Sequence, residues 1–145
     1  MKKVITGLMF LLLAIPFVHA DDVTKDETKL PAEARNFIKQ HFSNMEISHI
    51  KIDKELLRAD KYEVVFTNGT EIEFDHKGNW KEIDSKHHMV PSSVLPEHIR
   101  NYISSNFSGE PVTKVERTSR RYEVELNNDR TLKFDKDGNF LKLDD

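Results

Sequence analysis

Three β-strands are predicted by residues 62–84, which read YEVVFTNGTEIEFDHKGNWKEID. Apolar and polar side chains alternate over residues 62–66 and again over residues 71–74, and a period of two is typical of strands that bury one face. Asn68-Gly69, between these two strands, is a common hairpin turn. A second glycine-containing turn leads into the last strand, residues 80–84.

The same stretch occurs a second time in the chain. Residues 122–144 read YEVELNNDRTLKFDKDGNFLKLD, which keeps the alternation, both turns and the order of the shared residues at an offset of 60. Self-similarity over a fixed offset is the signature of an internal duplication. Residues 62–84 therefore predict the fold of residues 122–144 as well.

A helix is predicted before the strands of each copy. Leu30-Pro31 and Leu95-Pro96 each open a stretch in which apolar residues recur every three or four positions, as on one face of an α-helix. Proline suits the first helical position, because the N–H that it lacks has no partner there. The two apolar stripes end at Phe42 and Phe107, and we expect each ring to pack on the sheet of its own copy.

A further strand is expected between the helix and these three strands, at residues 47–53 and 112–118. The chain is therefore predicted to be an α+β protein of two tandem α-β-β-β-β repeats, residues 30–85 and residues 95–145. Alternating antiparallel strands leave one face of a sheet polar, so we expect an antiparallel sheet with the helices on one face and solvent on the other. Residues 86–94 link the two repeats. Residues 21–29 are polar and lack periodicity, which predicts a flexible leader.

The N-terminus has the features of a cleavable signal peptide, residues 1–20. Lys2 and Lys3 precede an apolar stretch at residues 8–18, which is shorter than the roughly 20 residues that cross a bilayer. Val18-His19-Ala20 follows, and we expect cleavage between Ala20 and Asp21. The mature protein is predicted to be periplasmic or secreted, with no stable membrane anchor.

Composition excludes several classes of function. The chain has no cysteine, so it has no thiolate nucleophile, thiolate metal site or disulfide. Removal of Lys2 and Lys3 with the signal peptide leaves 20 of the 22 basic residues against 25 acidic ones, a net charge of −5. This acidity argues against nucleic acid and anionic membranes as partners, because both favour basic patches.

The motifs resemble those of a known family. Phe-Asp-x-x-Gly-Asn stands at residues 74–79 and again at residues 134–139, and each copy opens with Leu-Pro and ends with Ile-Asp or Leu-Asp. In these features the chain resembles the PepSY-like, beta-lactamase-inhibitor-like family of exported bacterial proteins. The resemblance implies a fold similar to that of the beta-lactamase inhibitory protein, with two helix-plus-sheet units side by side. No inhibitory loop motif can be carried over from it.

Neither a metal site nor an active site is predicted. Asp135-Lys136-Asp137-Gly138-Asn139 has the form of a calcium loop, but the further oxygen ligands of such a loop do not follow it, and a hairpin turn explains both copies. His87-His88 has no third metal ligand at a suitable spacing. No serine stands in a nucleophile elbow, and no glycine-rich phosphate loop is present. We therefore expect a non-enzyme without a cofactor.

The open sheet face is the candidate protein-binding site. By alternation it carries acidic residues in both repeats and one aromatic residue in each, which could anchor a partner protein. The alternative is that the glutamates only keep this face solvated. The predicted residues are Glu63, Glu71, Glu73, Trp80, Glu82, Glu123, Glu125 and Phe140.

These features together favour an exported, non-catalytic binding module. Its partner is expected to be another envelope or secreted protein, and it could regulate or inhibit an envelope enzyme such as a peptidase or a beta-lactamase. The alternative function is an envelope protein that senses or binds a ligand or metal. The sequence leaves the oligomeric state open.

Overall fold

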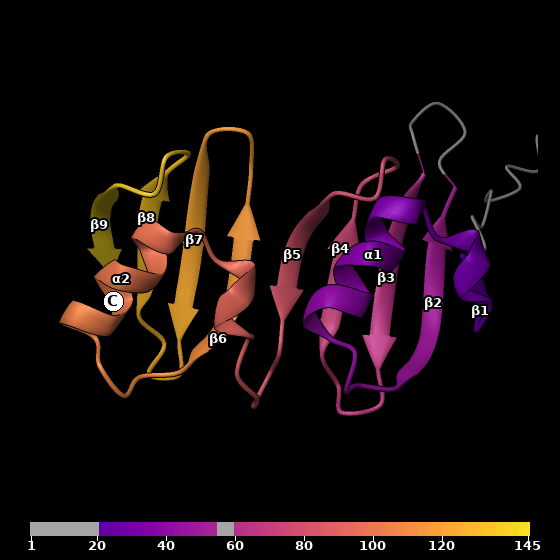
Figure 1. The fold of residues 1–145 in the computed structure, drawn as a ribbon, viewed down its shortest axis with the longest axis horizontal. Helices are drawn as coiled ribbons and strands as arrows, with labels where there is room; N and C mark the ends of the chain where they lie inside the picture. The colour runs from indigo at the N-terminus through magenta and orange to yellow at the C-terminus, as the bar shows by residue number, and fades with distance from the viewer. Residues whose placement is uncertain (1–20, 55–59) are drawn as a thin grey trace, which may run out of the picture.

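The computed structural model describes residues 21–54 and 60–145. The predicted signal peptide, residues 1–20, lies outside the described residues. Within them the chain forms an α+β fold of one nine-stranded antiparallel sheet and two α-helices (Figure 1). The strands lie in the sheet in the order in which they follow one another along the chain, so each interior strand pairs with its two neighbours in sequence.

The elements fall into two parts with the same order of helix and strands. The N-terminal unit comprises α1 (Ala32–His41), β2 (Ile47–Asp53), β3 (Lys61–Phe66), β4 (Glu71–Phe74) and β5 (Trp80–Asp84), and it is preceded by β1 (Asp22–Thr24) and the 3₁₀ turn η1 (Glu27–Lys29). The C-terminal unit comprises α2 (Glu97–Asn106), β6 (Val112–Arg117), β7 (Arg121–Leu126), β8 (Thr131–Asp135) and β9 (Phe140–Asp144), and it is preceded by the 3₁₀ turn η2 (Ser92–Val94).

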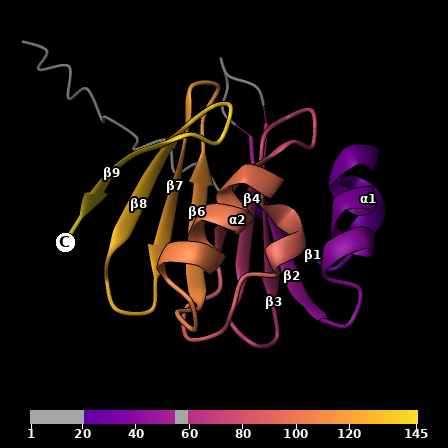
Figure 2. The ribbon, with the colours of Figure 1, turned by 60° about the vertical axis from the view of Figure 1, so that its left-hand side comes forward.

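Both helices lie on the same face of the sheet (Figures 1 and 2). The hydrophobic core fills the layer between the helices and the sheet. From β2 to β8, most apolar side chains of the strands that point to this layer are buried, as are Phe42 at the end of α1 and Ile99 in α2. Phe42 stacks on Phe66, with 5.6 Å between the ring centroids. The uncovered face of the sheet is called the open face below.

Residues 21–29 carry regular structure instead of forming the flexible leader predicted from the sequence. β1 pairs with β2, with Val23 opposite Lys51, and the Asp26 side chain accepts a hydrogen bond from the Thr28 N–H at the start of η1. The outer edge of β2 presents unpaired backbone groups that a short strand can satisfy. Composition did not reveal this pairing, because three residues are too few to show a period.

The linker, residues 86–94, also packs against the fold. The Val90 N–H donates to the Val112 carbonyl oxygen at 2.8 Å, and the side chains of Val90 and Val94 are buried. In η2, the Ser93 Oγ lies 2.8 Å from Nδ1 of His41 in α1. The linker therefore connects the two units by contacts of its own as well as by its backbone.

Each helix N-terminus packs on the turn before the last strand of its unit. Gly78 has φ of +88°, and a Cβ at this position would lie 2.8 Å from the Ala34 nitrogen and 2.9 Å from the Pro31 Cβ. Gly138 has φ of +85° and approaches the start of α2 in the same way. The glycine of the Phe-Asp-x-x-Gly-Asn motif thus permits both the turn and the close approach of the helix.

Candidate functional site

A row of charged side chains crosses the open face, with one residue from each strand between β2 and β9. The register places these residues directly opposite one another, and such pairs have Cβ atoms about 4.5–5.5 Å apart. In order, the row is Lys51, Glu63, Glu73, Glu82, Glu116, Glu123, Lys133 and Lys142. Its five consecutive glutamates, Glu63, Glu73, Glu82, Glu116 and Glu123, are called the acidic row.

Cations compensate parts of the acidic row. Lys51 contacts Glu63 at 2.6 Å, and Lys114 contacts Glu82 at 2.7 Å. Glu123 lies 2.9 Å from the Arg121 Nε. Exposed pairs of this kind contribute about 0–1 kcal/mol each, so they offset the repulsion only in part.

Glu73 and Glu116 are the two members of the row without an ion pair among the described residues. Burial, followed by the neighbouring carboxylates of Glu82 and Glu63, raises the pKa of Glu73. Glu116 is exposed and stands between Glu82 and Glu123. Like charges directly opposite each other destabilise a sheet, so neighbouring members of the acidic row repel one another.

The other two predicted glutamates also lie on the open face, two residues along their strands from the acidic row. Glu71 is opposite Asp84, and Glu125 is opposite Lys114 and Thr131. The ammonium group of Lys86 lies 3.3 Å from the Glu71 carboxylate and 3.0 Å from that of Asp84. The structure therefore brings all six predicted glutamates onto one face, with Glu71 partly neutralised.

The predicted place of Trp80 and Phe140 on the open face is wrong. Trp80 is 5% exposed and lies on the helix side, where it stacks on Phe37. Phe140 stacks on Tyr102 of α2 with 4.5 Å between ring centroids, and it is 37% exposed at the sheet edge. A β-bulge inserts one extra residue, Lys81 or Leu141, after each ring, which reverses the alternation.

Alternation alone missed residues that complete the acidic row. Glu116 fills the gap between the glutamates of the two units, and Lys51 and Lys114 supply their cations. Glu116 is the counterpart of Lys51 in the second repeat, at an offset of 65, and it follows the buried Val115. The repeat could therefore have indicated that the Glu116 side chain lies on the open face. Its neighbours in the row could not be deduced without the pairing of β5 with β6, which joins the two units.

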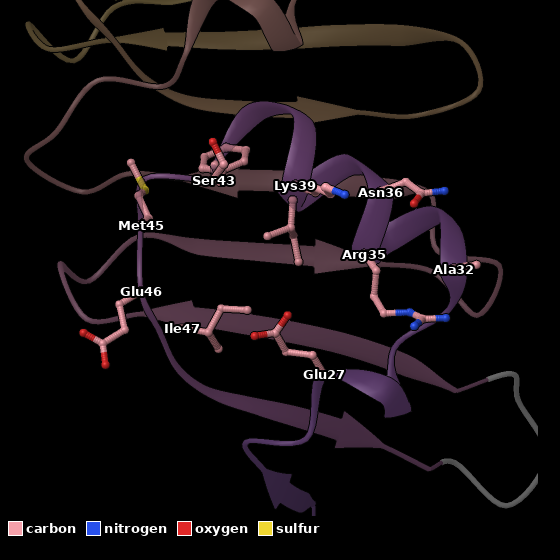
Figure 3. Close-up of a pocket in the computed structure, with 11 residues that line it drawn as sticks. Glu27, Ala32, Arg35, Asn36, Lys39, Ser43, Met45, Glu46 and Ile47 are labelled. Carbon is pink, nitrogen blue, oxygen red and sulfur yellow. The ribbon is translucent and has the colours of Figure 1, made fainter.

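Hollows lie on the helix side of the sheet beside each of the two helices. The hollow beside α1 has a volume of about 630 Å³, and Figure 3 shows its lining from α1, from the chain before β2 and from η1. Arg35, Lys39 and Glu46 provide charges around an apolar floor that includes Ile38 and Phe42. The corresponding hollow beside α2 has about 420 Å³ and is more apolar. Neither lining combines a nucleophile with a histidine base, which acyl-transfer chemistry would need.

Comparison with known proteins identifies the family. Residues 60–142 match the family described as "Putative beta-lactamase-inhibitor-like, PepSY-like". The chain belongs to this PepSY-like family. The resemblance seen in the sequence motifs is thereby confirmed. No match was found among curated proteins.

Three solved structures have the same fold as this PepSY-like protein, each with a TM-score of 0.80. One, from Bacteroides vulgatus, is described as a "putative periplasmic protein of unknown function"; it is 43% identical, over 87% of this chain and 100% of that chain. A "putative calcium-regulated periplasmic protein" from Bacteroides thetaiotaomicron is 42% identical, over 86% and 97%. Another structure from Bacteroides vulgatus, described as a "putative periplasmic protein", is 34% identical, over 88% of this chain and 99% of that chain.

All three relatives are described as putative periplasmic proteins. In residues 21–54 and 60–145 of the present chain, no helix has the length and hydropathy to cross a membrane. The signal-peptide cleavage site lies at the boundary of the described residues.

The turns of the PepSY-like motif use their carboxylates internally. Asp135 Oδ1 accepts hydrogen bonds from the Asp137 and Asn139 N–H groups, and Asp75 Oδ1 does the same for Lys77 and Asn79. Hydrogen bonds from Asn139 hold the pKa of Asp135 below its usual value. Across the part of the chain that the structure describes, no three His, Asp or Glu side chains are grouped as metal ligands.

Proposed function

We propose that this PepSY-like protein is an exported, non-catalytic binding module, and that its open face binds a basic surface of another envelope or secreted protein. The acidic row carries this proposal. Five glutamates directly opposite one another are an unfavourable arrangement for an isolated sheet. A partner that presents cations would convert this repulsion into attraction.

The geometry of the row suggests the chemistry of the partner. Five neighbouring strands span four strand spacings, or roughly 19 Å at about 4.8 Å each. A partner with lysine or arginine side chains spaced at about 5 Å over this length would match it. The field of the row would also speed the encounter with a basic protein.

A regulatory or inhibitory role is the finer part of the proposal. The two units have the same order of helix and strands, which supports an origin by tandem duplication. It also supports a likeness of the broad sheet to that of the beta-lactamase inhibitory protein. A sheet of this kind presents a wide surface and no catalytic grouping among the side chains described above. Binding, rather than turnover, is therefore the activity that we assign to it, with an envelope peptidase or beta-lactamase as the class of target.

Capture from envelope extract with matched charge reversals tests this proposal. Glu73→Lys with Glu116→Lys should remove the specific partner and slow its association, since both positions lack an ion pair among the described residues. Glu33→Lys with Glu97→Lys makes the same charge change on the helices and should retain the partner. Added salt should shrink the difference in association rate between wild type and the row variant. Equal recovery of the same proteins with both variants would refute the role of the acidic row.

An envelope calcium sensor is the second candidate function, because the Bacteroides thetaiotaomicron relative is described as a putative calcium-regulated protein. The Asp135–Asn139 turn and the acidic row supply carboxylate oxygens, which Ca²⁺ prefers. Calcium should then raise the melting temperature of the protein, whereas magnesium should not, and a chelator should reverse the effect. Asp137→Asn should abolish the rise if the turn binds the ion. A melting temperature that does not respond to calcium would remove this candidate.

Export itself is part of the proposal. Cleavage between Ala20 and Asp21 would leave β1 at the start of the mature chain. Mass spectrometry of the exported protein should therefore find Asp21 as its first residue. An intact Met1 species held in the membrane would contradict this.

A further inference from the structure

β9 is an outer strand of the sheet with apolar side chains in solvent. It lies at the end of the sheet opposite β1 (Figure 1), and no described strand pairs with its outer edge. Phe140 is 37% exposed, Leu141 57% and Leu143 38%. An exposed strand edge with apolar side chains is a template for pairing with another chain.

β5 is the counterpart of β9 in the N-terminal unit, and its outer edge is covered by another strand. Trp80 and Ile83 pair with β4 as Phe140 and Leu143 pair with β8, and both strands carry the bulge after the ring. β6 covers the outer edge of β5. There Trp80 is 5% exposed and Ile83 is fully buried. The two units thus contain a covered and an uncovered form of one strand edge.

β6 covers β5 with a simple pattern of residues. Lys114, Val115 and Glu116 stand opposite Asp84, Ile83 and Glu82. The Arg117 guanidinium carbon lies 4.1 Å from the centre of the Trp80 ring, and its Nε donates to the Trp80 carbonyl oxygen at 2.7 Å. The outer edge of β5 is therefore covered by a basic residue, an apolar residue, an acidic residue and an arginine, in this order along β6.

The exposed residues of β9 fit the same pattern. Asp144 occupies the position of Asp84, Leu143 that of Ile83, and Phe140 that of Trp80. Lys142 replaces Glu82, so a glutamate opposite it would be attracted, whereas Glu116 stands opposite a like charge in the folded chain. Opposite charges across strands stabilise a sheet.

We propose that β9 binds an extended segment of a partner protein in antiparallel orientation, and that this segment carries the order basic, apolar, acidic, arginine. The basic residue would face Asp144, the apolar one Leu143 and the acidic one Lys142. The arginine would cover the Phe140 ring. This edge is separate from the acidic row, so its occupation does not depend on the function proposed above.

Neither β6 nor β2 of a second copy of the chain is well suited to cover β9. Its β6 is enclosed between β5 and β7, and its β2, the strand equivalent to β6, is covered by β1. Lys51 is the residue of β2 at the position of Glu116, and it would stand opposite Lys142 as a like charge. The pattern therefore points to a different protein as the source of the segment.

A peptide with the sequence of residues 113–118, TKVERT, is the probe for this proposal. Titrated into the full exported protein, it should shift backbone amide NMR signals of β9 and β8 in a saturable way. A peptide with Ala in place of its arginine should bind more weakly. The proposal fails if the shifts do not saturate or lie away from β9. It also fails if β9 signals change with protein concentration before peptide is added, which would make a second copy the occupant.

A charge exchange makes the test specific. Lys142→Glu should weaken binding of TKVERT about twofold to fivefold, the range that an opposite-charge pair across strands provides. A peptide with lysine in place of its glutamate should recover binding to this variant. Lys136→Glu makes the same charge change in the turn before β9 and should leave both affinities unchanged. Equal effects of the two variants would show that only net charge matters and would overturn the proposed register.

Discussion

The Arg117 guanidinium covers the Trp80 ring and at the same time binds the Trp80 backbone, so one side chain of β6 makes two contacts across the seam between the two units. A cation over an indole ring contributes about 0.5–2 kcal/mol, and a hydrogen bond from a charged donor about 1.5–3 kcal/mol. The joint between the units therefore depends strongly on this residue.

Arg117→Ala should lower the free energy of unfolding by about 2–3 kcal/mol, because it removes both contacts. Urea denaturation followed by circular dichroism measures this loss. Arg120→Ala, in the exposed turn after β6, is the matched control and should change stability by less than about 0.5 kcal/mol. Equal effects of the two substitutions would show that the seam does not need Arg117.

Phe42 and Phe107 should differ in their contribution to stability, although the sequence places both at the end of a helix stripe. Phe42 is fully buried on Phe66, whereas Phe107 is half-buried beneath the Arg130 guanidinium, 5.1 Å from its ring centre. Phe42→Ala should cost about 3–5 kcal/mol. Phe107→Ala should cost about half as much, since less area leaves water. Melting curves of the two variants would contradict this if Phe107→Ala were the more harmful.

Substitutions of Gly78 and Gly69 distinguish the cost of a left-handed backbone from the cost of steric overlap with the helix. Both have φ of +88°, but only Gly78 lies against other atoms, those of Pro31 and Ala34. Gly69→Ala should cost about 1–2 kcal/mol from the left-handed backbone alone. Gly78→Ala should cost a further 1–3 kcal/mol or so, because the helix start must move. Chemical denaturation of both variants gives the difference, and equal losses would show that the helix adapts freely.

Glu73 should destabilise the folded protein at neutral pH. Burial and the adjacent Glu82 and Glu63 raise its folded pKa above the ordinary value of 4.5, so the ionised form is disfavoured on folding. Glu73→Gln should therefore raise stability by about 0.2–1 kcal/mol at pH 7. The gain should shrink as the pH falls through the folded pKa, and it should vanish below about 4.5, where both states bind the proton.

Melting temperatures of wild type and Glu73→Gln between pH 7 and pH 4 measure this dependence. Glu46→Gln, at an exposed position before β2, is the control and should show no gain at any pH. A gain for Glu73→Gln that persists at pH 4 would mean that its origin is not the charge.

Sequence reasoning identified the family, the α+β class and the face of six open-face glutamates, because these follow from motif order and a period of two. It misplaced Trp80 and Phe140, since a bulge shifts the period by one residue without a glycine or proline to mark it. It also missed Arg117 and Glu116 at the seam. Their contacts depend on β5 meeting β6, and a pairing between two repeats leaves no local pattern in either.

The pairing of every strand with its neighbour in sequence has a consequence for how the chain folds. Within each unit the turns that join β3 to β4, β4 to β5, β7 to β8 and β8 to β9 are short, so the loop entropy lost on adding these strands is small. Nucleation can begin in either unit and spread strand by strand toward both ends. Amide hydrogens in β1 and β9 should then exchange with solvent soonest, and those near the seam last.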